Sequence, residues 1–294
     1  MKNALTRCPR TDELQSLRHI WKSAFGDSGM DAFFASYADS YRRAAIVDDT
    51  PVAAGYLFPA GNLICNGQTT PCAMIYAIAV LPEFRNLGLG SAIVGELVSA
   101  GRGAGYPAIV LCPAEDSLFE YYGSHVGFCD WFRINERILS SPAPLNTQPG
   151  LCEISPEEYF RLRESLLENT PHIETDIRAL SYQTLLCKQL GGGLFRIDAP
   201  GGVSCAVIER QTDGGVCVKE LLTPEVIVTD SVLNIALSII AAAFPASKYT
   251  VRTLAEHTEA RPGNRRFGML AAPDVLISQK YSGNAAPWYG IAFD

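Results

Sequence analysis

A short turn containing two glycines is the part of the sequence with the clearest chemistry. Arg85, Gly88 and Gly90 follow Pro82 and come directly before an amphipathic stretch typical of a helix. Glycines at the start of a helix let backbone N–H groups approach a ligand closely, and the helix dipole favours negative charge there. The turn therefore predicts a binding site for a phosphate or pyrophosphate.

Two common phosphate loops do not fit this turn. A dinucleotide-binding fingerprint that starts at Gly88 requires glycine at the position of Ile93. A P-loop requires Gly-Lys-Ser or Gly-Lys-Thr, which the chain does not contain. We therefore expect the turn to bind the phosphates of a different cofactor.

The turn and the strand before it resemble motif A of the GNAT superfamily of acyl-CoA-dependent N-acyltransferases, V-x-P-x-x-[RQ]-G-x-G-x-[GA]. Here the motif reads Val80-Leu-Pro82-Glu-Phe-Arg85-Asn86-Leu-Gly88-Leu-Gly90. Asn86 stands where the family most often has glycine. Asparagine tolerates a left-handed backbone better than other residues with a side chain, so we expect the loop to keep its conformation.

The resemblance extends to an aromatic-rich helix at the family's separation from motif A. This segment reads Leu118-Phe-Glu-Tyr121-Tyr122-Gly-Ser-His-Val-Gly127-Phe128. In the family, a tyrosine of this helix protonates the departing coenzyme A thiolate. Tyr122 matches that position when counted from Leu118, but one additional residue before Gly127 keeps Tyr121 as the alternative.

The resemblance implies acetyl-CoA as co-substrate, no metal, and a site made largely of backbone groups. The strand backbone at Ile78, Ala79 and Val80 is expected to hold the pantetheine arm and the thioester carbonyl. The pyrophosphate is assigned to the loop, whose residues are Asn86, Leu87, Gly88, Leu89, Gly90 and Ser91, with Arg85 at its entrance. The implied reaction is direct attack of a neutral amine on the thioester, with both substrates in one ternary complex.

The general base and the acceptor are less well specified. Glu83, His125 and water relayed through backbone carbonyls are candidates for the base. Cys112 is interpreted as a structural thiol rather than an acyl carrier. The net charge of −7, Asp27 and the terminal Asp294 predict a cleft that attracts a cationic amine, and Asp294 is a further candidate base. The expected acceptor is a primary amine on a small molecule or a peptide.

Composition restricts the class of protein. The chain has 294 residues, 48% of them hydrophobic and 19% charged, which is enough for two globular domains. Its 24 Lys and Arg against 31 Asp and Glu do not favour nucleic acid or a membrane surface as a partner. Nine cysteines without a C-x-x-C pair, no secretory signal and no apolar run of membrane-spanning length predict a soluble, cytoplasmic protein.

The elements expected around the motif are those of an α/β (α+β) fold. Helices are predicted over 11–24, 30–41, 89–101 and 115–124, and strands over 44–47, 53–58, 74–80 and 108–112. Asp27 or Ser28 is expected to cap the second helix. The strand 74–80 is apolar on both faces and is expected to pair in parallel with 108–112.

The second half repeats this order of elements. Helices are predicted over 156–169, 181–190 and 231–244, and strands over 194–197, 204–209, 216–222, 249–254 and 288–293. The turn matching motif A, residues 223–231, contains no glycine and carries Pro224 and Glu225, so we do not expect it to bind coenzyme A. Asp230 or Ser231 is expected to cap the next helix, and Glu220 to lie at an edge or face the acceptor.

The chain as a whole resembles tandem-GNAT proteins of Gram-positive anaerobes. The matching segments are Trp21-Lys-Ser-Ala-Phe25-Gly26-Asp27, Phe267-Gly-Met-Leu270 and Gly290-Ile-Ala-Phe-Asp294. The enhanced-intracellular-survival acetyltransferases are more distantly similar and have an additional third domain. The resemblance implies two GNAT-like domains, each a mixed, mostly antiparallel sheet with a parallel β-α-β core and flanking helices.

A segment rich in proline, residues 141–150, is predicted to be a linker. It would separate a catalytic GNAT domain, residues 1–140, from a degenerate GNAT-like domain, residues 151–294. The expected function is that of an acetyl-CoA-dependent N-acetyltransferase. The alternative is a non-catalytic protein that binds or senses acyl-CoA.

Overall fold

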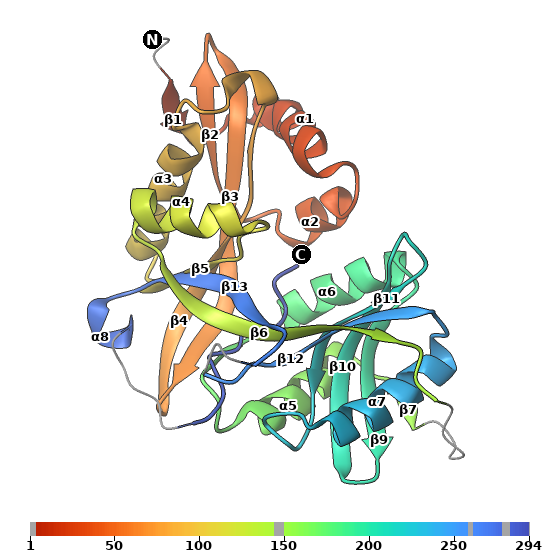
Figure 1. Ribbon diagram of the computed structural model, residues 1–294. Helices are drawn as coiled ribbons and strands as arrows, with labels where there is room; N and C mark the ends of the chain where they lie inside the picture. Colours follow the sequence, from red (N-terminus) through yellow and green to blue (C-terminus); the bar gives the residue numbers. More distant parts are fainter. Residues whose placement is uncertain (1–3, 144–149, 258–260, 278–282, 294) are drawn as a thin grey trace. The chain divides into compact units, whose positions relative to one another are not determined.

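The chain forms two compact units, and neither is an uninterrupted half of the sequence. The computed structural model describes residues 4–143, 150–257, 261–277 and 283–293 (Figure 1). Unit 1 consists of Met1–Leu63, Thr69–Trp131 and Gly268–Gln279, and unit 2 of Ile64–Gln68, Phe132–Phe267 and Lys280–Asp294. Most of the predicted linker, residues 144–149, lies outside the described residues.

Unit 1 is built on a sheet with the strand order β1-β2-β3-β4-β5-β13. The strands are β1 (Leu5–Arg7), β2 (Tyr41–Val47), β3 (Thr50–Cys65), β4 (Gln68–Val80), β5 (Ala108–Leu111) and β13 (Asn264–Ala271). The helices are η1 (Thr11–Glu13), α1 (Leu14–Phe25), α2 (Met30–Ser36), η2 (Pro82–Phe84), α3 (Leu89–Gly103), α4 (Asp116–Val126) and α8 (Asp274–Ile277).

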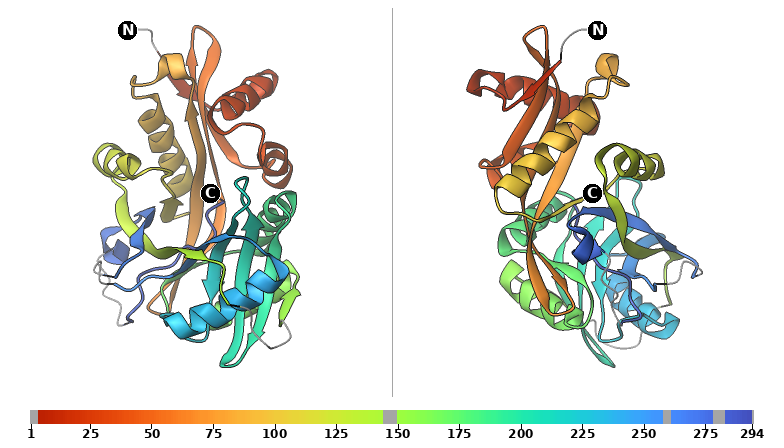
Figure 2. Two further views of the ribbon diagram at one scale, coloured as in Figure 1. Left: turned by 45° about the vertical axis from the view of Figure 1, so that its right-hand side comes forward. Right: turned by 90° about the vertical axis from the view of Figure 1, so that its left-hand side faces the viewer.

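Side-chain alternation along β3 and β4 places the helices of unit 1 on opposite faces of its sheet. Leu57 and Ile75 belong to one hydrophobic core with the apolar side of α3 and with Phe119 of α4. Tyr56 and Tyr76 point to the other face, where each packs against Trp21 of α1 at ring-centroid distances of 5.8 Å. Figures 1 and 2 show α3 on one side of the long β3–β4 hairpin and α1 and α2 on the other.

Unit 2 repeats this plan with the strand order β6-β12-β11-β10-β9-β7. The strands of unit 2 are β6 (Cys129–Ser140), β7 (Leu151–Glu153), β8 (His172–Glu174), β9 (Gly193–Ala199), β10 (Gly202–Arg210), β11 (Val216–Leu222) and β12 (Lys248–Leu254). The helices are α5 (Pro156–Leu167), α6 (Ile177–Gln189) and α7 (Asp230–Ala243). α7 connects the parallel strands β11 and β12, as α3 connects β4 and β5. The predicted α/β class and the repeated element order are confirmed.

Each unit completes its sheet with a strand from the other half of the sequence. Met269 to Ala271 of β13 pair antiparallel with β5 in unit 1. Ile134 to Ser140 of β6 pair antiparallel with β12 in unit 2. The strand that follows the parallel pair is therefore exchanged in both units, and neither β6 nor β13 was predicted from the sequence.

Three predictions about element ends are wrong. The second helix ends at Ser36 rather than Tyr41, because Tyr37 leaves helical geometry and its ring packs against that of Phe58 in a tilted arrangement, with the ring centroids 4.1 Å apart. Its N-cap is Gly29, in a left-handed conformation, rather than Asp27 or Ser28. α7 is capped by the hydroxyl of Thr229, which accepts from the N–H of Val232, rather than by Asp230 or Ser231.

The predicted terminal strand over 288–293 is also absent from the described residues. Trp288 forms an isolated bridge with His172, and the chain then takes left-handed conformations at Gly290 and Phe293. Gly290 makes a close approach, since a Cβ there would lie 2.1 Å from an oxygen of Glu220. This packing holds the segment in an irregular path that an extended strand cannot follow.

Candidate functional site

The predicted phosphate loop has the backbone that its sequence requires. Asn86 has φ of 63° and Gly88 has φ of 75°, so both are left-handed, as expected for asparagine in place of glycine. Gly88 is the N-cap of α3 and no side chain caps this helix end. The first N–H that bonds back is that of Ala92, to the carbonyl of Gly88 at 3.1 Å. The earlier N–H groups of α3 are therefore available to an anion.

Arg85 and Ser91 lie at the two ends of this exposed loop. Arg85 is exposed, and its Nε donates to the carbonyl of Val80 at 3.3 Å, which ties the loop to the end of β4. The hydroxyl of Ser91 donates to the carbonyl of Gly88 at 2.9 Å. Leu87 is 64% exposed, so the loop presents one apolar side chain beside its backbone groups and the guanidinium of Arg85.

The parallel strands β4 and β5 separate at the point where the resemblance places the pantetheine arm. Their pairing runs from Cys72 to Met74 and stops there, although β4 continues to Val80. Ala77 has φ of 50°, a left-handed residue inside the strand that breaks its regular geometry. The segment predicted to be a fully buried strand is buried only to Ile75, with Ala79 as the one buried residue beyond it. One edge of β4 is therefore free of β5 at Ile78, Ala79 and Val80.

The two tyrosines of α4 have different environments. Tyr122 is 8% exposed and packs in the hydrophobic core beside Phe128, and burial raises its pKa to about 12. Tyr121 is half-buried, and its hydroxyl lies 3.5 Å from the position of a Cβ built on Gly90. Its ring stacks on that of His125 at 4.8 Å. Tyr121 is thus the tyrosine whose hydroxyl lies beside the phosphate loop.

The candidate bases and the acidic candidates for acceptor binding lie in ordinary surface environments. Glu83 is exposed on η2. A ring nitrogen of the exposed His125 lies 3.0 Å from the carbonyl of Tyr121, and Asp27 is exposed and paired with Lys22. Asp294 lies outside the described residues. Cys112 is half-buried just after β5, and all nine cysteines are free thiols.

The corresponding turn of unit 2 has little space for a phosphate. Pro224 is so close to β10 that a Cβ on Gly202 would lie 2.8 Å from its ring. The cavity between this turn and α7 has a volume of about 40 Å³ and includes Glu225 in its wall. A cavity of this size holds about one water molecule and has a carboxylate at its edge. This geometry supports the prediction that the second turn does not bind coenzyme A.

Glu220 is fully buried rather than at an edge or facing an acceptor, which corrects the prediction. Its carboxylate accepts hydrogen bonds from Tyr159 at 2.8 Å, Arg163 at 3.0 and 3.2 Å, and the indole of Trp288 at 2.7 Å. Arg163 also donates to the carbonyl of Ile173. The group connects α5, β11 and the C-terminal segment of unit 2. Sequence reasoning missed it because its members lie far apart along the chain.

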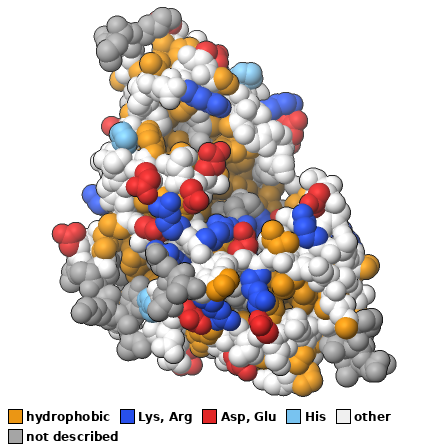
Figure 3. All heavy atoms as spheres, viewed as in Figure 1, with side chains coloured by type: hydrophobic (Ala, Val, Ile, Leu, Met, Phe, Trp, Pro, Cys, Tyr) orange, Lys and Arg blue, Asp and Glu red, His pale blue; other side chains and the backbone are white. Residues whose placement is uncertain are grey.

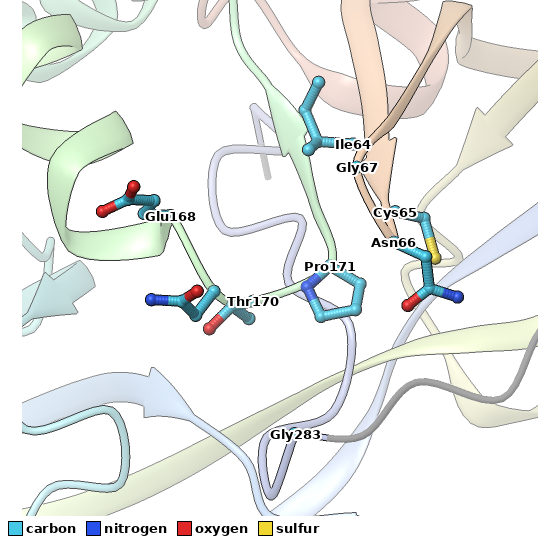
Figure 4. A pocket seen from close by; sticks show the side chains of 9 residues that line it. Ile64, Cys65, Asn66, Gly67, Glu168, Thr170, Pro171 and Gly283 are labelled. Atoms are coloured by element: carbon cyan, nitrogen blue, oxygen red, sulfur yellow. The ribbon is translucent and has the colours of Figure 1, made fainter.

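A separate cavity of about 230 Å³ lies in unit 2 (Figure 4). The β3–β4 turn with Asn66 lies on one side, and Thr170 and Pro171 of the segment after α5 lie on the other. None of the predicted site residues lines it, so we assign it no role in the chemistry.

Surface charge and metal-binding side chains are two further features of the described residues. On the face drawn in Figure 3, acidic and basic side chains are interspersed. The described residues contain no group of three or more His, Cys, Asp or Glu placed to hold a metal ion. In the same part of the chain, no helix is long and apolar enough to cross a membrane.

The class of protein follows from these features together. A β-α-β unit whose parallel strands separate, a left-handed glycine loop at the start of its helix and a tyrosine beside that loop define a GNAT-type fold. Residues 11–128 match the model of the acetyltransferase (GNAT) family and form a domain of that family.

Solved structures with the same fold extend the likeness to nearly the whole chain. A GCN5-related N-acetyltransferase from Kribbella flavida has a TM-score of 0.65 at 15% identity, covering 93% of this chain and 72% of that one. Eis1 from Mycobacterium abscessus has a TM-score of 0.59 at 13% identity, covering 93% and 74%. A tandem GNAT protein from the clavulanic acid biosynthesis pathway has a TM-score of 0.54 at 14% identity, covering 92% and 98%. The search of curated proteins gives no match.

Proposed function

We propose that unit 1 transfers the acetyl group of acetyl-CoA to a primary amine of a small molecule or peptide. The observation that carries this proposal is the loop from Asn86 to Ser91, whose two left-handed residues leave the N–H groups at the start of α3 unpaired within the helix. Such an arrangement binds a pyrophosphate through its backbone. Arg85 adds a positive charge at the loop entrance.

The free edge of β4 is assigned to the rest of the cofactor. Backbone groups of Ile78, Ala79 and Val80 would bind the pantetheine amides and polarise the thioester carbonyl, because β5 no longer pairs with this segment. Because the protein would hold the thioester and the amine next to each other, their proximity and orientation would account for much of the rate enhancement. The amine nitrogen forms a bond to the carbonyl carbon and loses a proton to water, the carbon–sulfur bond breaks, and the sulfur leaves with its electron pair and takes up a proton.

We assign the proton donor for the departing thiolate to Tyr121, with Tyr122 as the alternative. The hydroxyl of Tyr121 lies beside Gly90, whereas the ring of Tyr122 fills the core. The base that deprotonates the substrate ammonium is assigned to water relayed through backbone carbonyls, because Glu83 and His125 are both exposed. The soluble, cytoplasmic location expected from the sequence remains part of this proposal.

A matched pair of variants tests the assignment. At saturating acetyl-CoA, Tyr121→Phe should lower kcat by about 10²–10⁴, as expected for loss of a general acid, with little change in acetyl-CoA affinity. Tyr122→Phe should lower kcat less than about tenfold. Free thiol release across a panel of amines, amino acids and peptides measures the rate. A larger loss of kcat in Tyr122→Phe than in Tyr121→Phe would assign the proton donor to Tyr122. Tight binding of acetyl-CoA without turnover of any amine would favour a non-catalytic acyl-CoA-binding protein.

A further inference from the structure

The face of the unit 1 sheet covered by α1 and α2 contains buried hydrogen-bond donors that have no acceptor. Within the described residues, the Nε1 of Trp21, the Nε of Arg42 and the hydroxyl of Tyr56 are all buried without a hydrogen-bond partner. An indole N–H and a guanidinium N–H can only donate. Folded proteins rarely leave such groups unpaired, so three of them in one place indicate an acceptor group that binds there.

These groups surround one side chain, the half-buried ring of Phe34 on α2. Its ring centroid lies 5.9 Å from that of Trp21 and 5.7 Å from that of Tyr56. The guanidinium carbons of Arg18 and Arg42 lie 4.8 and 5.7 Å from the same centroid. Arg42 and Tyr56 are also direct partners across β2 and β3. The donors therefore belong to one compact cluster with Phe34 at its centre.

The cluster carries positive charge among aromatic rings. Arg18 pairs with the exposed Asp31 at 2.5 Å. Arg42 donates from its Nη2 to the carbonyl of Ala38 at 2.6 Å and has no carboxylate partner among the described residues. Burial raises the pKa of Tyr56 above its ordinary value, and the charges of Arg42 and Arg18 act against that rise. A negatively charged group would neutralise Arg42 and accept from the unpaired donors at the same time.

The cluster lies next to the strand segment assigned to the thioester. Tyr76 contacts Trp21 at 5.8 Å and Phe33 at 5.3 Å, and it directly precedes the left-handed Ala77 of β4. Ile78, which begins the thioester segment, follows Ala77. The cluster and the assigned thioester segment therefore lie within two residues of each other along β4, and we place the amine of a bound acceptor toward this segment.

We infer that Arg42, Tyr56 and Trp21 bind an oxyanion carried by the acceptor, so that the substrate is an amine that also bears a carboxylate or phosphate. This inference rests on the proposed function, whose acceptor it specifies. The ring of Phe34 must turn aside to admit the oxyanion. The half-buried Phe34 lies at the edge of this packing, whereas the adjacent Phe33 is fully buried and holds α2 in place, so the movement required is that of the Phe34 side chain.

The test uses the full chain and acceptors in matched pairs, each amino acid being compared with its carboxamide and with an aminoalkyl phosphate of similar length. With acetyl-CoA, the anionic acceptors should have kcat/KM at least tenfold above the carboxamides. The relative rates of acid and phosphate identify the oxyanion. Equal rates for charged and uncharged acceptors would overturn the inference and leave the acetyltransferase function in place.

Variants separate binding from folding. Arg42→Met should raise KM for the anionic acceptor at least tenfold and leave acetyl-CoA affinity unchanged. Arg43→Met is the matched control, because Arg43 is the adjacent residue of β2 and lies near Glu96 instead. Tyr56→Phe should weaken binding of the anionic acceptor without lowering Tm, because the hydroxyl of Tyr56 makes no hydrogen bond within the protein that the variant would lose. A lower Tm with unchanged KM would assign Tyr56 to structure alone and contradict its role here.

A binding measurement distinguishes failure of this inference from failure of the proposed function. The anionic acceptors alone should raise the Tm of the wild-type chain, and Arg42→Met should abolish that rise. If the rise is seen but acetyl-CoA does not bind, the transferase proposal fails and the oxyanion site stands. If acetyl-CoA binds but no anionic acceptor raises Tm or reacts, the oxyanion site is refuted.

Discussion

Asn86 and Gly88 are the two residues on which the loop conformation depends, and only one of them is glycine. Replacing Asn86 by glycine keeps the left-handed backbone, so the Kd for acetyl-CoA should stay within about threefold of wild type. A β-branched residue is a genuine outlier at positive φ, and the strain of about 1–3 kcal/mol should weaken binding about tenfold or more in Asn86→Val. Calorimetric titration measures both. Equal affinity in all three proteins would show that the loop does not bind the cofactor.

The backbone conformation of the loop could be predicted from the sequence. Which of Tyr121 and Tyr122 points toward the loop could not. Asn86, Gly88 and Gly90 are close in sequence, so their spacing specifies the turn and even the left-handed backbone at Asn86. The orientation of Tyr121 and Tyr122 depends on how α4 packs. One residue of shift in a helix rotates a side chain by about 100°, enough to exchange a core position for a loop-facing one. The additional residue before Gly127 therefore left the choice open.

Among the elements, α5 and β11 are joined by the buried pair of Arg163 and Glu220. Glu220→Gln should lower the free energy of unfolding by about 3–5 kcal/mol, because it leaves a buried guanidinium without full compensation. Arg163→Met should lower the free energy of unfolding by a similar amount. The double variant should lower the free energy of unfolding by less than the sum of the two single effects, since neither buried charge is then left without its partner. Urea unfolding of the four proteins measures the coupling.

An exposed pair of the same unit provides the control. Arg196 and Asp198 lie on β9 at 2.7 Å with both side chains about half exposed. Asp198→Asn should change the free energy of unfolding by less than about 1 kcal/mol, because exposed ion pairs contribute little. Equal effects of Asp198→Asn and Glu220→Gln would mean that burial of Glu220 does not determine its contribution.

The carboxylate of Glu13 stabilises the N-terminal segment of unit 1 through hydrogen bonds from Arg7 and Arg10. Its carboxylate accepts from Arg7 at 2.6 and 2.8 Å and from the backbone N–H of Arg10 at 2.6 Å. The hydrogen bond from Arg7 is the largest cause that lowers the pKa of Glu13 from 4.5 to about 2. A lowered carboxyl pKa stabilises the fold fully above pH 4.5, and this contribution is lost as pH falls toward 2.

The Tm difference between wild type and Glu13→Gln should accordingly be constant from pH 7 to about 5 and shrink as pH falls toward 2. Thermal unfolding across this range measures it. Arg7→Met should show the same pH dependence, because it removes the main partner of the same carboxylate. A Tm difference that persists unchanged to pH 2 would show that the charge of Glu13 is not its source.

For the molecule as a whole, the described residues show an open glycine loop of the predicted phosphate-binding type in unit 1 and a closed turn at the matching position of unit 2. We expect one acetyl-CoA per chain. Gly88→Glu should weaken that binding at least about tenfold, because the carboxylate opposes the pyrophosphate where a charged hydrogen bond is worth about 1.5–3 kcal/mol. Pro224→Gly should leave the stoichiometry at one, since the turn still carries Glu225. A stoichiometry of two in the wild-type chain would contradict this assignment.

The two-unit plan was predictable because the order of elements repeats, with α3 and α7 each joining a parallel pair. The exchange of β6 and β13 was not. It depends on pairing between Met269–Ala271 and Ile109–Leu111, which lie more than half the chain apart. Hydrophobic periodicity reports which residues are buried within one element and carries no information on such distant partners.

The strand exchange also orders the events of biosynthesis. On the ribosome, β5 emerges long before β13, because more than half of the 294 residues separate the two strands. Until then β5 has an unpaired edge, and such edges are templates for association with other chains. The free edge of β5 must therefore be shielded until β13 has emerged, and the sheet of unit 1 is complete only from that point.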